Sequence, residues 1–260
     1  MTSIINKIKI LVGLVCLSLL FGCEDIIDFP LKESQKLPVI DAEFDMYTGI
    51  CMVKVSQTQS LLDKEPSPVV SGLEVSIQYD NTKSKIFIET EKGTYQSEKF
   101  MASPGKTYTL IIKNLMGQEY RAKAVAPNLI LPIVKDSVIK YTSNGIDVAF
   151  EWNDPQNQEN YYWPILTVNK VPQKSWDNIT SDNGRNGNTM FANLQVNAMK
   201  SDEIGIQLQS LDADSFRYYQ QLINLSFGGQ LPYNSKNNFD KPAAGVFRII
   251  NYKPIKLTLK

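Results

Sequence analysis

Few side chains in this 260-residue chain could carry out nucleophilic or metal chemistry. Histidine is absent, which excludes imidazole metal ligands and every Ser-His or Cys-His nucleophile pair. The three thiols are Cys16, Cys23 and Cys51. Cys51 alternates with Val53 and Val55 on one face of a predicted strand, so we interpret it as a buried small side chain rather than a reactive thiol. We therefore predict no enzyme, no catalytic residue and no metal or cofactor site.

Cys23 stands at the end of a stretch typical of a secretory signal. Lys7 and Lys9 form a basic start, and residues 10–22 are apolar or small. That stretch is shorter than the roughly 20 helical residues that span a bilayer. Its end, LLFGC over residues 19–23, resembles the bacterial lipobox, with leucine three residues before the cysteine and glycine directly before it. We predict a signal peptide over 1–22 and a covalent lipid, palmitate included, on Cys23. A plain cleaved signal or a short hydrophobic anchor is the alternative.

Acidic residues follow this cysteine directly. Glu24, Asp25 and Asp28 fit either a surface-export signal or a solvated linker, and we assign residues 23–38 to the acylated N-terminus and linker. The chain carries 27 basic and 27 acidic side chains, and loss of residues 1–22 would remove two basic ones. A mildly acidic mature chain lacks the bulk positive field that gathers nucleic acid, so we expect no nucleic-acid partner.

Residues 39–127 show the alternation of strands with one buried face. In the run 73–79, Leu73, Val75, Ile77 and Tyr79 point one way and polar side chains point the other. Gly-to-Tyr units recur at 93–95, 105–108 and 117–120, a spacing typical of short strands joined by turns. This half predicts a β-sandwich.

Residues 128–260 form a second predicted β-rich domain. Strands are indicated at 146–152, 161–168 and 204–208, with Pro164 favouring an edge or a bulge. Asp212 is a plausible N-cap for one helix over 212–225, which the sequence FGG at 227–229 ends. Residues 246–250 and 255–259 are expected to close the sheet of this half, and residues 171–190 to form a long polar loop. The predicted fold is mainly β, with two β-sandwich domains of the immunoglobulin or transthyretin type.

The remaining polar motifs have ordinary structural explanations. Residues 182–187, DNGRNG, resemble a calcium loop only in part, because glycine occupies the third ligand position and Asn193 stands where a bidentate glutamate is needed. Asp212 and Asp214 fit helix capping better than acid-base catalysis. Among the aromatic residues near the loop, Trp152 and Trp163 fall on inward faces. Trp176 and Tyr162 remain as candidate contacts for a ligand or partner.

The order of these features resembles one known family. The resemblance rests on CEDII at 23–27, VIDAE at 39–43, the Gly-Tyr-marked sandwich ending at 126–127, LDADSFRYY at 211–219, and the later GG at 228–229 and PY at 232–233. Together they are similar to the Bacteroidota lipoproteins grouped as domain of unknown function 4249 (DUF4249), over essentially the whole mature chain. The resemblance implies an outer-membrane lipoprotein facing the cell surface, associated with TonB-dependent transporters. It also favours an export role for the acidic residues after Cys23.

Three functional hypotheses compete, beside a purely structural role in the envelope. The first is a non-enzymatic accessory or binding lipoprotein, held on the membrane by its lipid and acting with a TonB-dependent transporter. The second is a glycan-binding lipoprotein that uses exposed aromatic rings of residues 153–190. The third is a hydrolase that uses carboxylates. We adopt the first, with the second as its alternative.

Overall fold

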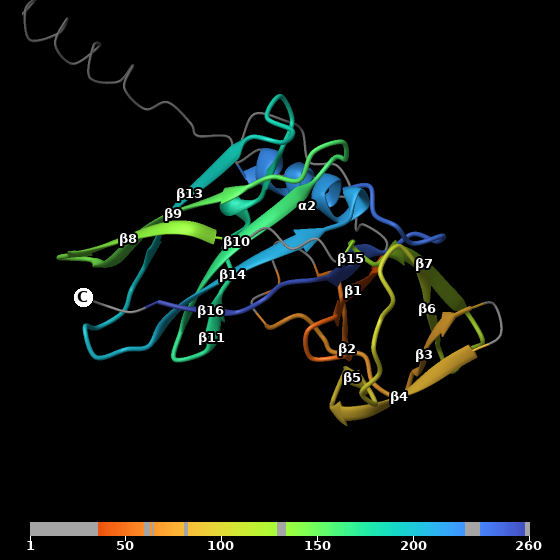
Figure 1. Cartoon of the computed structure of the whole chain (residues 1–260). Coiled ribbons are helices and arrows are strands. Elements are labelled where there is room, and N and C mark those ends of the chain that lie inside the picture. The colour runs from red at the N-terminus through yellow and green to blue at the C-terminus, as the bar shows by residue number, and fades with distance from the viewer. Residues whose placement is uncertain are drawn as a thin grey trace, which may run out of the picture. The chain divides into compact units, whose positions relative to one another are not determined.

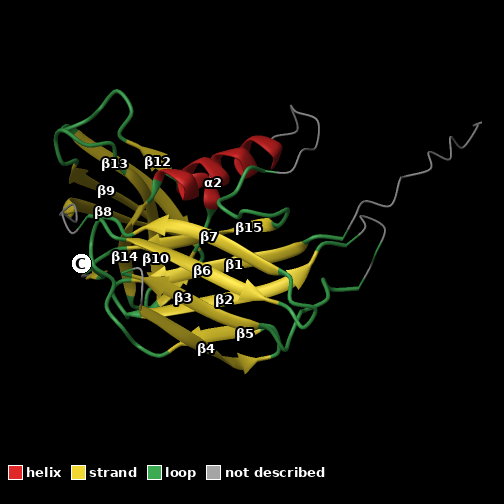
Figure 2. Ribbon diagram, turned by 90° about the vertical axis from the view of Figure 1, so that its right-hand side faces the viewer, coloured by secondary structure: helices red, strands yellow, loops and turns green. Residues whose placement is uncertain are grey.

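The computed structural model describes residues 36–59, 63, 65–80, 83–128, 134–226 and 235–257. The predicted signal peptide, Cys23, Glu24, Asp25 and Asp28 lie outside these residues, as do the motifs at 227–229 and 232–233. Within the described residues the chain is mainly β, as predicted, with the helix α2 (Ala213–Ser226) beside the sheets (Figure 1, Figure 2).

The first seven strands belong to one eight-stranded sheet that folds over a single hydrophobic core, and we call this half the first sandwich. They are β1 (Pro38–Asp45), β2 (Ile50–Gln57), β3 (Glu74–Tyr79), β4 (Lys83–Glu91), β5 (Thr94–Ser97), β6 (Thr107–Lys113) and β7 (Glu119–Val125). Strand β4 turns from one layer into the other, because its first half pairs with β3 and its second half with β5. Farther along the strand, the register with β5 shifts between Glu89 and Glu91. The predicted inward faces are confirmed: Val53, Val75, Ile77 and Leu110 are all buried in this core.

The Gly-Tyr units mark turns and strand starts, as predicted. Gly93, Gly105 and Gly117 all have φ between 70° and 79°, a left-handed conformation that favours glycine. Tyr95 and Tyr108, from the strands that follow the first two glycines, are buried in the core. The local pattern therefore gave both the turn positions and the inward faces.

The second half forms two further sheets. The first has the order β11-β10-β14-β16, with β12 also paired to β10; the second has the order β13-β9-β8. The bounds are β8 (Val134–Thr142), β9 (Gly145–Asn153), β10 (Tyr161–Val168), β11 (Val171–Gln173), β12 (Thr180–Ser181), β13 (Thr189–Val196), β14 (Ile204–Leu211) and β16 (Ile255–Lys256). A second core fills the space between them and contains Phe150, Trp152, Leu166, Leu194 and Ile206.

Two local predictions for this half need correction. Residues 171–190 are not one irregular loop, because they contain β11, a 3-10 turn (Trp176–Asn178), β12 and the start of β13. Strand β10 is interior rather than an edge. Pro164 lies opposite Leu208 of β14 on one side, and it is tolerated because no strand of the described residues pairs with it on the other, where a missing N–H breaks no ladder bond. On its other side it falls between the residues paired with β12 and those paired with β11.

Strand β15 (Ala244–Ile250) joins the two halves. It was expected to close the sheet of its own half; instead it pairs in parallel with β1, from Val39 opposite Ala244 to Asp45 opposite Ile250. Both of its faces are buried. Phe247 and Ile249 belong to the core of the first sandwich, whereas Val246 and Ile250 belong to a third core. The division at residue 127 into two domains stays a prediction, because a strand from the second half completes a sheet of the first.

Helix α2 begins where the sequence indicated. Asp212 is its N-cap: the backbone N–H of Ser215 donates to Oδ1 of Asp212 at 2.8 Å, and the Ser215 hydroxyl donates to Oδ2 at 2.9 Å. Tyr218 and Tyr219 pack in the third core with Trp163 of β10 and Val246 of β15. Among the described residues, no helix has the length and apolar character to cross a membrane.

Candidate functional site

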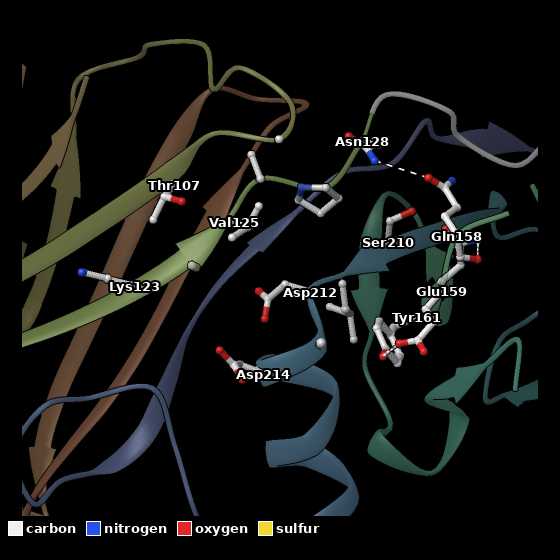
Figure 3. A pocket seen from close by; sticks show the side chains of 17 residues that line it. Thr107, Lys123, Val125, Asn128, Gln158, Glu159, Tyr161, Ser210, Asp212 and Asp214 are labelled. Atoms are coloured by element: carbon white, nitrogen blue, oxygen red, sulfur yellow. Dashed lines mark hydrogen bonds between the residues drawn. The ribbon is translucent and has the colours of Figure 1, made fainter. Parts of the chain in front are cut away.

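A pocket of about 620 Å³ lies where the first sandwich meets the second half of the chain (Figure 3). One side comes from β6 and β7 and the chain after them, and the other from residues 158–161 and 210–214. Figure 3 shows Gln158, Glu159 and Tyr161 along one side, Lys123 and Val125 along the other, and the start of α2 between them. We call it the junction pocket. Its position means that its shape depends on both halves.

Asp212 has a structural duty at this pocket. Both carboxylate oxygens accept hydrogen bonds from Ser215, which fix the start of α2. Burial, foremost, raises the pKa of this carboxyl, and the Ser215 bonds partly oppose that increase. The neighbouring Asp214 is exposed and forms an ion pair with Arg217 one turn along the helix. Each of these two carboxylates therefore already has a partner within the protein.

The opposite side combines amides with an aromatic ring. The amide of Asn128, just past the predicted boundary at residue 127, donates to Oε1 of Gln158 at 3.4 Å. Tyr161 donates its hydroxyl to Glu159 at 2.8 Å, and its ring stacks on Phe216 with centroids 4.7 Å apart. Burial first, and then the Glu159 carboxylate, raises the pKa of the Tyr161 phenol.

This arrangement suits binding. General acid-base catalysis needs a carboxyl or another titratable group that is free to exchange a proton with substrate. In the junction pocket Asp212 caps a helix, Asp214 pairs with Arg217 and Glu159 accepts from a tyrosine. What the lining offers a ligand is a set of hydrogen-bonding amides, hydroxyls and carboxylate oxygens beside a tyrosine ring.

A second hollow of about 500 Å³ lies on the outer face of β1 and β2. Arg248 of β15 also lines it, with a side chain that is 6% exposed. Its Nε and Nη2 donate to Oε2 of Glu43 at 2.9 and 2.8 Å, and it also pairs with Asp41. Lys174 contacts the same Glu43 oxygen at 2.7 Å. Burial acts to raise the pKa of Glu43, but these two cations outweigh it and lower that pKa.

A buried acidic pair lies beside the second core. Asp154 and Asp182 are 4% and 3% exposed, and Asp154 accepts hydrogen bonds from the Tyr162 hydroxyl and from the Gly187 backbone. Tyr162 is itself 1% exposed. The expectation that Tyr162 contacts a ligand or partner is therefore wrong, because its ring is buried and its hydroxyl is used inside the protein.

The other sequence candidates separate clearly. Cys51, Trp152 and Trp163 are buried, as predicted. Trp176 starts the 3-10 turn, but its side chain lies outside what the structure describes, so its role as a contact stays a prediction. Asn186 of the partial calcium loop is held by bonds to the backbone of Asn157 and Gln158. Across the described ranges, no group of three or more metal-ligating side chains converges.

Sequence reasoning missed Arg248 and the junction pocket. Arg248 carried a signal, because it is a lone charge in the apolar strand β15, AGVFRII. Such a residue is buried only when it is paired. The pocket carried no local signal, since its sides come from segments about 30 to 100 residues apart.

Comparison with known proteins places the chain in a family. Residues 24–254 match the family described as Domain of unknown function (DUF4249), and the chain belongs to it. No curated protein matches the chain.

Two solved structures are similar over most of this chain. A candidate carbohydrate-binding protein from Bacteroides uniformis ATCC 8492 is 12% identical, with 85% of this chain and 98% of that chain covered and a TM-score of 0.26. A structure from a 1.5-MDa bacterial ice-binding adhesin is 10% identical, with 87% and 66% covered and a TM-score of 0.21. At these TM-scores neither likeness bears on what this chain binds.

Proposed function

We propose that the mature protein is a non-enzymatic binding lipoprotein of the outer membrane, tethered through Cys23 and facing the cell surface. Its partner would be a TonB-dependent transporter. The signal, lipobox and acidic residues after Cys23 support the tether and the location. The observation that carries the binding role is the junction pocket, whose carboxylates are already engaged in capping, ion pairing and a tyrosine hydrogen bond.

Site-specific photo-crosslinking in cells tests the partner. Val125 lines the junction pocket and is 46% exposed, so a photoreactive phenylalanine there would contact a bound partner. Val138 on β8 is 55% exposed and serves as the matched control away from the pocket. We expect position 125, and not position 138, to cross-link to an outer-membrane β-barrel of the transporter class. Equal cross-linking at both positions, or none to such a barrel, would contradict the proposal.

A glycan ligand is the second candidate, and Tyr161 favours it. Gln158, Asn160 and Tyr161 all belong to the 153–190 region that the sequence singled out, and they line the junction pocket. Amides that bond hydroxyl groups, next to an aromatic ring that can pack on the apolar face of a sugar, are the chemistry that glycan recognition needs.

Retention of the purified protein on immobilised polysaccharides tests the glycan candidate. Tyr161→Phe keeps the ring stacked on Phe216, whereas Tyr161→Ala removes it. Tyr141, 39% exposed on β8, offers a Tyr→Ala control outside the pocket. If glycans bind here, Tyr161→Ala loses retention while Tyr141→Ala and wild type are retained alike. Unchanged retention of Tyr161→Ala on every polysaccharide would rule out a glycan site in this pocket.

A further inference from the structure

Two large apolar side chains project from the turn between β6 and β7. Leu115 is 88% exposed and Met116 is 94% exposed, among the most exposed large hydrophobic residues that the structure describes. Single exposed apolar residues are ordinary on protein surfaces. Two adjacent ones in a turn between paired strands form a continuous apolar projection, which we call the tip and which could enter an apolar phase.

The tip is held in one conformation by its own hydrogen bonds. Asn114 Oδ1 accepts from the backbone N–H groups of Met116 and Gln118, at 3.0 and 2.9 Å. The Gly117 N–H donates to the Asn114 carbonyl at 2.9 Å, and the Asn114 N–H donates to the carbonyl of Gln118. Gly117 supplies the left-handed conformation, with φ of 79°. The two side chains are thus presented by an ordered turn, so their insertion costs little additional backbone ordering.

Strand pairing places this tip at the end of the sandwich where the N-terminal segment enters. Leu37 bonds to Thr58 at the start of β1 and the end of β2. The start of β5 and the end of β4, the next strands across the sheet, lie at this same end. The Val55 N–H donates to the carbonyl of Gly93, just before β5, and the end of β4 lies opposite the start of β5.

The same end continues into the second layer. The Glu89 carboxylate of β4 accepts from the backbone N–H groups of Gly72 and Gly93, which ties the entrance of β3 to the turn before β5. Glu74, the first residue of β3, lies opposite Lys113, the last residue of β6. Leu115 and Met116 follow Lys113 directly. The tip and Leu37 therefore share one end, whereas the junction pocket takes Thr107 from the other end of β6.

The position of Cys23 limits how far this end can be from a bilayer. Twelve residues lie between Cys23 and Lys36, and the thirteen Cα–Cα steps that join the two reach about 45 Å at full extension. A single attachment at Cys23 limits the distance between this end of the sandwich and the bilayer, but it does not by itself set the orientation of the sandwich. Two apolar side chains at the tethered end would restrict the orientation, because a domain that contacts the membrane at two points can no longer rotate freely about one.

We propose that the Leu115-Met116 tip inserts into the lipid bilayer to which Cys23 is anchored. It holds that end of the sandwich on the surface, with the junction pocket at the other end of β6, above the membrane, where the external part of the partner transporter would have to reach it. This inference rests on the proposed tether. The partner that the tip contacts is the acyl and headgroup layer of a phospholipid bilayer. Chemistry of this kind needs no specific lipid, only an apolar phase within about 5–10 Å of the headgroups.

Fluorescence quenching by lipid tests the insertion. The full-length protein, acylated in a bacterial host, is reconstituted into vesicles of phosphatidylcholine and phosphatidylethanolamine that contain doxyl-labelled phosphatidylcholine. An environment-sensitive fluorophore is attached to Met116→Cys. The native thiol Cys51 is 0% exposed, which directs the label to the new cysteine. Met101→Cys is the matched control: Met101 is 64% exposed, and Phe100 beside it bonds to Gly49 of the β1–β2 turn, at the opposite end of the same sandwich.

Insertion predicts that doxyl lipid reduces emission from position 116 about twofold or more and leaves position 101 unchanged, since quenching requires depth within the acyl layer. Adding Leu115→Glu to the Met116→Cys protein should abolish the quenching while the anchor keeps the protein on the vesicles. If the protein is acylated and bound to the vesicles but doxyl lipid quenches both positions equally, the insertion is refuted and the tether is still supported. Quenching at position 116 without acylation would support insertion and refute the tether. Absence of both acylation and quenching at position 116 would refute the tether and the insertion together.

Discussion

Arg248 is a charged residue with a side chain only 6% exposed, in an otherwise apolar strand. It lies opposite Glu43 in the parallel pairing of β15 with β1, and its two nitrogens converge on one oxygen of that carboxylate. Its guanidinium also lies over the ring of Tyr219, 5.8 Å from the centroid. One side chain thus connects both halves of the chain and helix α2.

Replacing Arg248 by methionine should lower the free energy of unfolding by about 3 kcal/mol or more, because Glu43 keeps its buried charge and loses its main partner. Urea unfolding followed by circular dichroism measures this. Arg217→Met is the matched control. That arginine is 66% exposed in its pair with Asp214, so its loss should cost about 1 kcal/mol or less. Similar losses in the two variants would show that the buried pair contributes no more than a surface one.

Asp182 makes stability depend on pH in the opposite direction from Glu43. Burial, foremost, raises the pKa of Asp182; hydrogen bonds from Asn160 oppose the increase, and the charge of Asp154 adds to it. The folded state therefore holds this proton to a higher pH than the unfolded chain does. Its stabilising contribution is present below the usual carboxyl range and is lost as pH rises through the folded-state pKa.

Asp182→Asn cannot ionise and should escape that loss. Relative to wild type, the variant should gain stability as pH rises above the usual aspartate range, near about pH 4, because an unperturbed aspartate is already ionised there. Urea unfolding at a series of pH values gives the difference directly. A difference that stays constant, or that shrinks toward neutral pH, would contradict the raised pKa.

At the scale of elements, β15 approaches β1 so closely that one position admits no side chain. Gly245 has φ of 95°, and a Cβ built on it would lie 2.0 Å from the carbonyl oxygen of Ile40. The backbone of β1 cannot move away without breaking a parallel ladder of seven residue pairs. Glycine at 245 is therefore required by the junction between the two halves.

Gly245→Ala should lower the free energy of unfolding by about 2–5 kcal/mol, from backbone strain plus the collision with β1. Gly184→Ala is the control, because Gly184 has a similar left-handed φ of 73° and a Cβ added there would meet nothing within 4 Å. Its cost should be about 1 kcal/mol, from strain alone. Denaturant unfolding compares the two, and equal costs would mean that β15 tolerates displacement from β1.

Local patterns predicted the elements well, and pairing between distant elements poorly. Alternation at 73–79 and 146–152 identified strand faces, and Asp212 identified a helix start, because each depends on neighbouring residues only. The pairing of β15 with β1 joins residues about 205 positions apart, and nothing local in either strand specifies the other. Tyr162 was wrongly predicted to contact a ligand or partner for a related reason. Strand β10 is buried on both faces, so alternation could not show which rings reach the surface.

At the scale of the whole molecule, the residues from Lys36 onward form one compact unit. The ladder of β15 with β1 crosses the predicted boundary at residue 127, and so does the first core, which contains Phe247 and Ile249 of β15. If these contacts couple the halves, the two should unfold together.

Two native probes can detect such coupling. All three tryptophans lie after residue 128, so their fluorescence reports the second half, and the buried Cys51 reports the first sandwich through its reaction with a thiol reagent. We expect the urea midpoints from the two probes to coincide in wild type and to separate in Gly245→Ala. Separate midpoints in the wild-type protein would indicate two independent domains.

The proposed tether and the proposed insertion of the apolar tip would together hold the protein on a membrane, with the junction pocket as its proposed ligand site. Metabolic labelling with radioactive palmitate, in a bacterial host that expresses the full chain, tests the tether on which this arrangement depends. We expect label in the wild-type protein, recovered with the membranes, and none in Cys23→Ser. A wild-type protein that takes up no label and fractionates like Cys23→Ser would contradict it.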